Sequence, residues 1–447
     1  MTKKRKDINT IGDSALDDYI HALNILRARS TVDVDDETGY DFQAGIHNDV
    51  FIGPCEHGSD YFLAWHRAHL YYFEKLLQET DPSRTANVTI PYWDWLHPET
   101  IGKFPRAFAR PGLFMAGRNE HPDPSLPLEF LEPMTILPPN TLEIVSTEQN
   151  WSEFGGYPKG DPNGDYGRLE LGPHNRMHSF FIRGRMAEPS TAAEDAIYWS
   201  FHAFIDLLWA EWQRRNGMPA PTTPDGDLRG FLTKARHKIQ DFQKTDVLDF
   251  EYEYTDQLKE AFGMSQISGD KRALLATMSL RPLFIEGLEV ELTNTSRAQF
   301  AMQAPPAAAK TAMVRLRNLK VPTTGSYMLR AYVHPKNVAF DRNDPEFQRR
   351  YAVGYVSLWK SHGDESHHGG HEEHHGHSPE SHHPTACTVR FDVTKPLLDL
   401  APGATPDLVL TLHFIPAPDQ TGEPQLNTEL IKEVQLEDVL LEAYAQP

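Results

Sequence analysis

The sequence predicts a mainly α-helical domain over residues 1–270, followed by an all-β sandwich domain over residues 271–447. Three observations support this division. Apolar residues recur at helical spacing in the first half, short β-branched and aromatic runs replace them after about residue 281, and 447 residues exceed one ordinary hydrophobic core. We therefore expect two domains that join between about Phe262 and Ser279, where the helical pattern fades.

Three segments of the first half have the spacing of packed helices. Their apolar positions lie about three and four residues apart, which gathers them on one face of a helix. Proline and glycine crowd residues 104–173, so we expect long loops between the second and third helices. The expected helices are Ala15–Arg27, Phe62–Leu77 and Tyr198–Gln213.

Seven short runs in the second half are typical of strands in an antiparallel sandwich. They lie at residues 283–292, 312–321, 326–333, 352–359, 387–393, 407–415 and 434–444. A low-complexity, histidine-rich segment at 361–384 interrupts them, and it contains nothing that could form a core, so we expect a disordered loop. Two roles remain open for its histidines: a merely solvated insertion, or capture of copper or zinc.

The overall composition excludes several classes of partner. The net charge of -20 argues against nucleic acid, because phosphate binding relies on clustered Lys and Arg. No segment approaches the roughly 20 apolar residues that cross a membrane. The N-terminus lacks an apolar leader and the chain has only two cysteines, Cys55 and Cys387, so we expect a cytoplasmic protein. The oligomeric state stays open.

Six histidines fall into two sets of three. The sets are His47, His57 and His66, and His174, His178 and His202. His174 and His178 lie four residues apart and share a helix face, as two imidazoles need to reach one ion. His21 is the alternative to His47, which is the least certain member. Imidazole suits copper, zinc, iron and nickel, so the residue chemistry alone leaves the metal open.

The residues around these histidines carry a family resemblance. FLAWHRAHLYYFE, which contains His66, resembles the first-copper signature of tyrosinases and hemocyanins, and His57 lies nine residues before His66 as in that family. PHNRMH followed by DAIYWSFHAFIDLLWAEWQ resembles the second-copper signature, and PYWDW at residues 91–95 is a further hallmark. Over roughly residues 15–215 the chain is similar to the tyrosinase and polyphenol oxidase family of type 3 dinuclear copper proteins.

This resemblance implies a four-helix bundle that holds two copper ions, one on each set of three histidines. It implies dioxygen as the cosubstrate and a small phenol as the substrate. The implied reactions are monophenol hydroxylation, as a monooxygenase, and oxidation of o-diphenols to o-quinones. The alternatives are a catechol or o-aminophenol oxidase without monophenol hydroxylation and a hemocyanin-like oxygen-binding protein. A zinc hydrolase that uses the same histidines is more remote.

Four further residues match family positions close to the ligands. Cys55 lies two residues before His57, as in the Cys-x-His pair that forms a thioether crosslink in many relatives; the alternative is a buried free thiol. Glu170 and Asn175 match a pair thought to hold a water that removes the phenol proton. Asp165 is the reserve for that base, and a surface position is the alternative for Glu170.

The residues around His178 and His202 complete the expected site. Asp206 is expected to orient a ligand or to pair with an arginine such as Arg67. Phe201 replaces the first histidine of the family's His-His pair, which should change activity more than copper binding. Ser179 should leave the substrate entrance fairly open, and Arg183 either attracts a carboxylate-bearing phenol or is simply solvated. The β domain resembles one that covers the copper site in relatives, either as a stabilising lid or to keep the enzyme latent.

Overall fold

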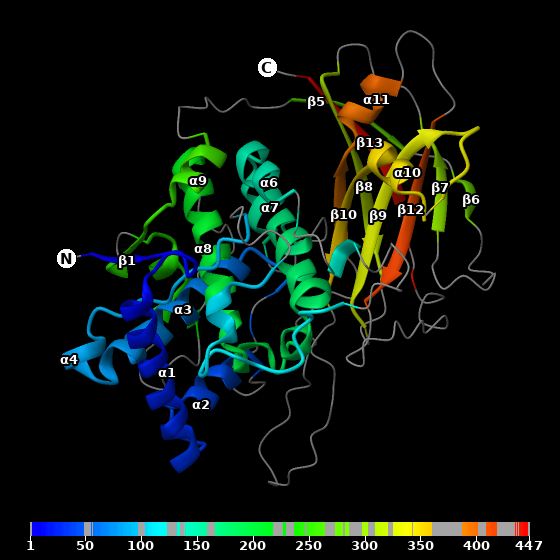
Figure 1. The fold of residues 1–447 in the computed structure, drawn as a ribbon. Coiled ribbons are helices and arrows are strands. Elements are labelled where there is room, and N and C mark those ends of the chain that lie inside the picture. The colour runs from blue at the N-terminus through cyan, green and yellow to red at the C-terminus, as the bar shows by residue number, and fades with distance from the viewer. Residues whose placement is uncertain are drawn as a thin grey trace, which may run out of the picture.

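The structure of the chain is a computed structural model, in which helices and large β-sheets occupy different parts (Figure 1). It describes residues 2–48, 55, 57–96, 103–122, 132–134, 138, 140–158, 166–217, 227–228, 237–245, 248–263, 273–279, 282–285, 297–302, 309–320, 325–341, 343–359, 387–400, 408–417, 434, 436 and 438–445. Asp165 and the histidine-rich segment 361–384 lie outside these residues, so the expectations for them stay predictions.

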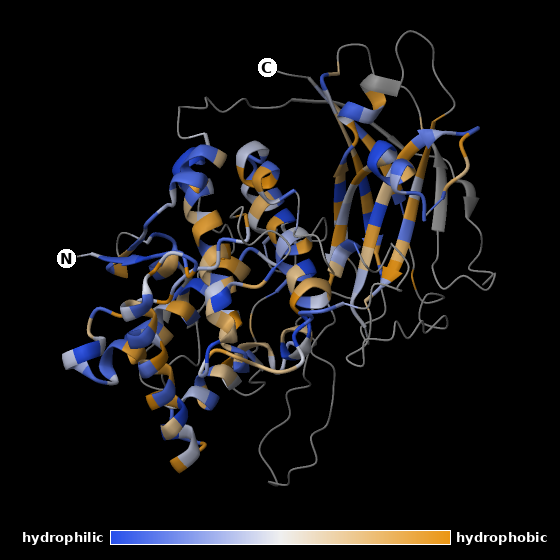
Figure 2. Ribbon diagram, viewed as in Figure 1, coloured by the Kyte–Doolittle hydropathy of each residue, from blue (hydrophilic) through white to orange (hydrophobic). Residues whose placement is uncertain are grey.

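The three expected helices are present, each somewhat longer than the pattern indicated. The helices of the first part are α1 (Asp13–Val32), α2 (Tyr40–Gly45), α3 (Phe62–Glu79), α4 (Pro82–Thr85), α6 (Thr141–Thr147), α7 (Trp151–Gly155), α8 (Ala196–Asn216) and α9 (Asp256–Ala261). The buried residues of α1 recur at helical spacing. Figure 2 shows both apolar and polar residues along this helix. α3 and α8 pack against each other and are buried along nearly their whole lengths.

The ends of α8 follow from two local signals. The Asp195 carboxylate accepts a hydrogen bond from the backbone N–H of Ile197 at 3.1 Å, which caps the first turn. Gly217 ends the helix in the left-handed region, with φ of 77°, where a residue with a Cβ would be strained. Asp195 is itself held by a buried ion pair with Arg118, so the start of α8 is fixed in the core.

The segment that carries His174 and His178 is a helix with two π-helical turns, η3 (Glu170–His174) and η4 (Met177–Ile182). Pro173 lies inside it and has no N–H to donate to a regular helical ladder. Wide turns of this kind are rare and occur frequently at functional sites. The expected proximity of the two histidines is confirmed, because their ring centroids are 4.5 Å apart.

The second part contains two large antiparallel sheets. A five-stranded sheet has the order β10-β9-β12-β7-β6, and a four-stranded sheet has the order β11-β8-β13-β5. Their strands are β5 (Ala273–Ser279), β6 (Pro282–Ile285), β7 (Arg297–Ala301), β8 (Thr311–Leu319), β9 (Tyr327–Pro335), β10 (Ala352–Leu358), β11 (Cys387–Asp392), β12 (Leu408–Pro416) and β13 (Asp438–Ala445). The sequence pattern missed β5, β7 and two short helices, α10 (Pro345–Tyr351) and α11 (Thr394–Leu400).

Two small sheets lie outside these. β1 (Lys3–Arg5) pairs in parallel with β4 (Phe250–Tyr252), and β2 (Asp227–Leu228) pairs with β3 (His237–Lys238). The β1–β4 pair brings the start of the chain against residues that follow α8. It therefore ties the two ends of the helical part together.

One hydrophobic cluster contains residues of both large sheets and of the helical part. Leu316 in β8, Leu412 in β12 and Leu441 in β13 belong to it and are fully buried. Leu171, from the π-helical segment, packs into the same cluster. The β part therefore shares its core with the segment that carries His174.

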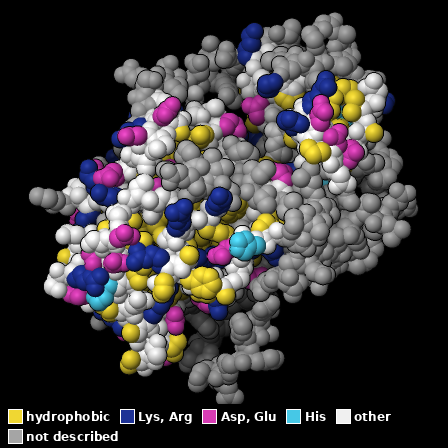
Figure 3. Space-filling view, in the orientation of Figure 1, with side chains coloured by type: hydrophobic (Ala, Val, Ile, Leu, Met, Phe, Trp, Pro, Cys, Tyr) yellow, Lys and Arg dark blue, Asp and Glu magenta, His cyan; other side chains and the backbone are white. Residues whose placement is uncertain are grey.

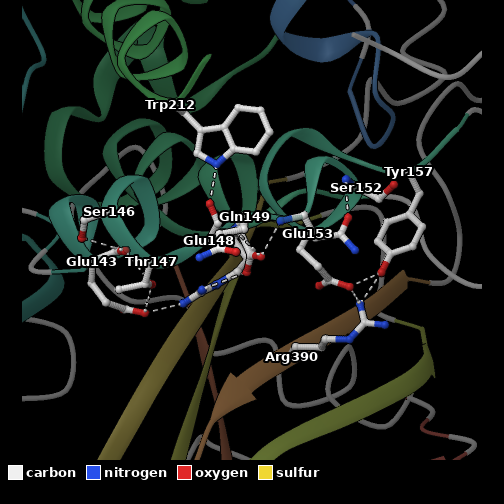
Figure 4. Close-up of polar contacts among 12 residues, drawn as sticks. Glu143, Ser146, Thr147, Glu148, Gln149, Ser152, Glu153, Tyr157, Trp212 and Arg390 are labelled. Atoms are coloured by element: carbon white, nitrogen blue, oxygen red, sulfur yellow. Dashed lines mark hydrogen bonds and ion pairs between the residues drawn. The ribbon is translucent and has the colours of Figure 1, made fainter. Parts of the chain in front are cut away.

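Polar contacts fasten the β part to the helical part at α7 and the residues that follow it (Figure 4). Arg390 in β11 pairs with Glu153 at 2.6 Å and donates to the Tyr157 hydroxyl at 2.6 Å. Burial raises the pKa of the Glu153 carboxyl, although Arg390 opposes this shift. A cavity of about 70 Å³ lies beside these groups, between α6 and the strands β10 and β11.

The visible surface mixes charges of both signs. Over the helical part, Lys and Arg side chains alternate with Asp and Glu on the face shown in Figure 3. Within the described ranges, no helix has both the length and the apolar character needed to cross a membrane.

Candidate metal centre

The six predicted histidines meet inside the helical part, although they come from five different segments. His47 lies in the turn η1 (Ile46–Asn48) after α2, His57 in the loop before α3, and His66 on α3. His174 and His178 lie on the π-helical segment and His202 on α8. All six side chains are buried, with at most 3% of any of them exposed. The alternative His21 lies elsewhere, where it pairs with Asp81 and is one-third exposed.

The ligand atoms form three overlapping groups, within each of which all atoms lie within 4.8 Å of one another. His174, His178 and His202 form one group, as the sequence predicts. The other predicted set is divided differently. His57 and His66 group with His174, and His47 groups with Cys55 and His57. The ring centroids of His47, His57 and His66 are nevertheless only 5.2 to 6.0 Å apart, so the set of three is compact.

Five of the six imidazoles are oriented in the same way. In each, Nδ1 lies within hydrogen-bonding distance of a protein oxygen. The partners are Pro189 O for His47 (2.7 Å), Glu170 Oε1 for His57 (2.9 Å), Phe62 O for His66 (2.8 Å), Asn175 Oδ1 for His174 (2.8 Å) and Met186 O for His178 (2.7 Å). A carbonyl oxygen only accepts, so Nδ1 carries the proton and Nε2 keeps its lone pair. Metal-binding histidines are held in this manner.

The free ring nitrogens face one another rather than water. Among the described residues, Nε2 of His66 and of His174 is buried and has no hydrogen-bond partner. Burial lowers the pKa of His66, His174 and His202 well below the usual range, and lowers the pKa of His178 to about 3. These imidazoles are therefore neutral at pH 7, the protonation state that a metal ion requires.

Glu170 is a buried residue of this site, so the alternative of a surface carboxylate is wrong. Its side chain is 0% exposed. Oε1 accepts from His57 Nδ1 at 2.9 Å, and both carboxylate oxygens lie 3.1 Å from the backbone N–H of Gly58. Cys55 is buried beside the same histidine, with its sulfur in the group that contains His47 and His57. The loop that carries His57 is thus held by the π-helical segment.

Asn175, on the π-helical segment, contacts both His174 and the β part. Its Oδ1 is 2.8 Å from His174 Nδ1, and its Nδ2 donates to the carbonyl of Ser357 in β10 at 2.7 Å. The predicted pair of Glu170 and Asn175 is therefore buried close to His57 and His174, and each member contacts one of these two histidines.

Asp206 ties together the two long helices that carry His66 and His202. The expected pair with Arg67 is confirmed, with Asp206 Oδ1 2.5 Å from Arg67 Nε. Oδ2 lies 3.4 Å from Arg5 Nη1 and accepts from the Tyr252 hydroxyl at 2.5 Å. Because Arg67 follows His66 and Asp206 lies one turn after His202, this buried network fixes both ligands relative to each other.

The residues expected at a substrate entrance are buried in this arrangement. Phe201 is fully buried, with its ring 5.7 Å from that of His174 and 5.1 Å from that of His178. Ser179 is 1% exposed and Arg183 is 7% exposed. Arg183 adopts a positive φ of 59° at the end of η4, which is unusual for a residue with a side chain. Neither residue lies on an open approach to the histidines.

Sequence reasoning missed the side chain that covers the site. Trp359, which directly follows β10, stacks on His178 with ring centroids 4.0 Å apart and planes at 23°. Its Nε1 donates to Ala187 O at 2.8 Å, and its ring lies 5.3 Å from that of His57 and 5.7 Å from that of His174. Alternation along the strand places Tyr355, Ser357 and Trp359 on a common side, but nothing in the sequence states which element they meet.

A seventh histidine supports the site without joining it. His69 lies one turn after His66, and its Nδ1 contacts the Tyr198 hydroxyl at 3.1 Å while its Nε2 contacts Gln43 O at 2.9 Å. Burial lowers the pKa of His69 to about 4. Tyr198 packs on His202, with ring centroids 4.3 Å apart. This chain links α8 to α2, which leads into His47.

Comparison with known proteins shows which family this chain resembles. Residues 37–135 and 131–215 match the common central domain of tyrosinase. Tyrosinase HcTyr1 of Hahella sp. (strain CCB-MM4) is 30% identical over 322 residues, which span 61% of this chain and 67% of that protein. Chloroplastic polyphenol oxidase E of Solanum lycopersicum is 25% identical over 491 aligned positions, covering 98% of this chain and 78% of that protein.

A solved structure extends the likeness to the whole chain. The structure of latent apple tyrosinase matches with a TM-score of 0.64 at 17% identity, covering 100% of this chain and 97% of that one, which shows a shared fold. The helical core, the β-sheets and the buried cluster of imidazoles are together typical of the dinuclear copper proteins. The chain belongs to the tyrosinase and polyphenol oxidase family of dinuclear copper oxidoreductases that act on phenols.

Proposed function

We propose that the chain uses dioxygen to hydroxylate monophenols and to oxidise o-diphenols to o-quinones. The observation that carries this proposal is the common orientation of five imidazoles, each with Nδ1 held by a protein oxygen. In this proposal His47, His57 and His66 bind one copper ion, and His174, His178 and His202 bind a second. When bound, the two copper ions would supply the redox chemistry by which electrons pass from the phenol to dioxygen.

The protein environment suits such chemistry in two ways. Aromatic side chains, among them Phe62, Phe201 and Trp359, surround the histidines and exclude water. The Arg67–Asp206 pair holds α3 and α8 in register, so the ligands are fixed before any metal binds. Apolar walls and preset ligands both favour a reaction at the copper centre over side reactions with solvent.

Glu170 and Asn175 are proposed to hold the water that takes the proton of a monophenol. Support comes from their burial next to His57 and His174. The Asn175 amide carries two N–H bonds, and the contact with Ser357 uses one of them. A catechol or o-aminophenol oxidase is the second candidate, because this contact with β10 reduces what Asn175 can offer to a water.

We also propose a thioether between Cys55 Sγ and an imidazole carbon of His57. The S–H and C–H bonds break as the S–C bond forms, and their hydrogens leave as two protons together with two electrons, which reduce one dioxygen to hydrogen peroxide. Proximity supports this bond, since the sulfur lies in the same group as the ring nitrogen of His57. A tryptic peptide that contains both residues, two hydrogen atoms lighter than calculated after copper loading, would reveal the crosslink.

The β part is proposed to form a sandwich domain over residues 271–447 that keeps the site closed, while residues 1–270 form the catalytic domain around a four-helix bundle. The shared core of the two large sheets supports the sandwich. Trp359 over His178 supports the closed state. The apple tyrosinase with a similar fold is described as latent, which agrees with this proposal.

Oxygen uptake by the copper-loaded chain tests the activity. A monophenol and the corresponding catechol are supplied separately, with and without limited proteolysis to relieve closure. Uptake with both substrates supports the proposal, and uptake with the catechol alone would make the protein a diphenol oxidase. Reversible oxygen binding without turnover would point to an oxygen carrier, and the absence of both would overturn the proposal.

A further inference from the structure

The edge strand β10 lies directly against the helix that carries His174 and His178. Every second residue at its end contacts this helix or its ligands. The Arg176 guanidinium lies 4.5 Å over the ring of Tyr355, the Ser357 carbonyl accepts from Asn175, and Trp359 stacks on His178. The strand is therefore docked along the ligand helix rather than at a single point.

The second of these contacts links β10 to His174, a proposed metal ligand, through the side-chain amide of Asn175. Asn175 Nδ2 lies 2.7 Å from Ser357 O, and Asn175 Oδ1 lies 2.8 Å from His174 Nδ1. His174 and Ser357 are 0% exposed and Asn175 is 1% exposed, so water does not compete for these contacts. Each contact also has an ordinary hydrogen-bond length.

The chemistry of these groups allows only one arrangement of protons. A backbone carbonyl accepts and never donates, so the NH₂ end of Asn175 must face Ser357. The amide is planar, so its oxygen then faces His174. An amide oxygen only accepts, which places a proton on His174 Nδ1 and leaves the lone pair on Nε2. That Nε2 atom is buried in the histidine cluster.

We propose that β10, through the Ser357 carbonyl and Asn175, is a positioning element of the metal centre that sets the tautomer and ring orientation of His174. The β part is then a structural component of the centre as well as its cover. This inference rests on the proposed function in one respect, the assignment of His174 as a ligand.

His174 differs in this respect from the other oriented ligands. Nδ1 of His47, His66 and His178 bonds to carbonyls of Pro189, Phe62 and Met186, which all belong to the helical part. The orientation of His174 depends instead, through Asn175, on a strand residue 182 positions beyond Asn175 in the chain. If β10 moves away, the affinity for the copper ion assigned to His174 should fall first, because the Nδ1 contacts of His47, His66 and His178 stay in place.

Three full-length variants separate this role from simple packing. Asn175→Leu has a similar shape but loses both the acceptor and the donor. Asn175→Asp keeps the size of the side chain but places a carboxylate oxygen against the Ser357 carbonyl, and the repulsion between the two turns the side chain away from His174. Tyr355→Phe is the matched control, because it removes the 2.9 Å hydrogen bond to Asn140 at the same strand and leaves Asn175 intact.

Two measurements are made on each chain: titration of the metal-free protein with copper ions, and ¹⁵N-histidine NMR of the metal-free protein. We expect wild type and Tyr355→Phe to bind two ions and to show the His174 Nδ1–H tautomer. Asn175→Leu and Asn175→Asp should bind one of the two ions about 10- to 100-fold more weakly. They should also lose the single tautomer.

Wild-type affinity and tautomer in Asn175→Asp would overturn the inference, because Ser357 would then be unnecessary. Equal weakening in Tyr355→Phe would overturn it too, since any loss of interface stability would suffice. The proposed function fails separately, if wild type itself does not bind two copper ions. The NMR comparison still decides the role of Ser357 in that case, because it needs no metal.

Discussion

Trp359 stacks on His178 at a centroid distance of 4.0 Å, so a residue from the β part covers a histidine of the helical part. The indole is held in place by its hydrogen bond to Ala187 O at 2.8 Å. A phenol that approaches His178 along this side meets the indole before it meets the histidine. The two parts must therefore move, or the side chain must rotate, before substrate reaches the proposed coppers.

Trp359→Ala should increase oxidation of a catechol by the copper-loaded chain. An increase of about tenfold or more in kcat/KM corresponds to a shift of about 1.4 kcal/mol in the balance between closed and open states. Removal of a buried indole should also lower the free energy of unfolding by about 3–5 kcal/mol. Trp359→Phe keeps a ring over His178 and should stay near wild type. Unchanged or lower kcat/KM in the alanine variant would show that the indole does not restrict access.

His178→Ala should abolish phenol oxidation and reduce bound copper toward one ion per chain. The remaining histidines of its set, His174 and His202, leave the second ion with two ligands instead of three. Copper content and oxygen uptake are measured on the same preparations. His21→Ala is the control, because this histidine pairs with Asp81 away from the cluster and should leave both quantities unchanged. Full oxidase activity in His178→Ala would contradict the assignment of the site.

Asp206→Ala should destabilise the whole helical part. The substitution leaves the buried guanidiniums of Arg67 and Arg5 without this carboxylate, and the loss of one partner of a buried ion pair costs about 3–5 kcal/mol. Urea unfolding followed by circular dichroism measures this loss. Glu251→Ala is the matched control at the Lys4–Glu251 pair, where both side chains are 52% exposed. That change should lower the free energy of unfolding by less than about 0.5 kcal/mol. Equal losses of stability in the two variants would show that the buried Asp206 network stabilises the fold no more than an exposed ion pair.

The metal-free chain should lose stability as the pH falls below about 6.5, the pKa of histidine in the unfolded chain. Burial lowers the pKa of His66, His174 and His202 well below that value, and that of His178 to about 3. The unfolded chain therefore binds more protons between these limits, so acid favours unfolding. Each such histidine contributes up to about 1.4 kcal/mol per pH unit.

Urea unfolding of the metal-free chain at about pH 7 and about pH 5 measures this slope. In His178→Gln the slope should fall by up to about 1.4 kcal/mol per pH unit, because one titrating group is gone. A stability that does not change over this range would show that the histidines are hydrated and not buried. Saturating copper should raise the stability at both pH values and leave the slope unchanged, since the folded imidazoles are already neutral over this range and the unfolded chain still takes up protons.

The sequence determined the long helices and the chemistry of the site. Their apolar spacing is local, and five of the six histidines stand in motifs whose fixed separations place them on or beside α3, the π-helical segment and α8. His47 stands in no such motif, so the sequence left His21 as an alternative to it. The strands β8 to β13 were also visible as short β-branched runs. β5 and β7 were not, because ALLATMS and RAQFA are short and lack a clear alternation of polar and apolar residues.

Only the tertiary structure decided how the two parts meet. Trp359, Ser357 and Arg390 carry no signal of their partners, because these contacts join residues more than 170 positions apart in the chain. The proton positions on His174 follow from such a contact and not from any local motif. Ligand identity is a property of residue type and spacing, which a sequence displays; ligand orientation and access depend on distant backbone groups, which only folding brings into contact.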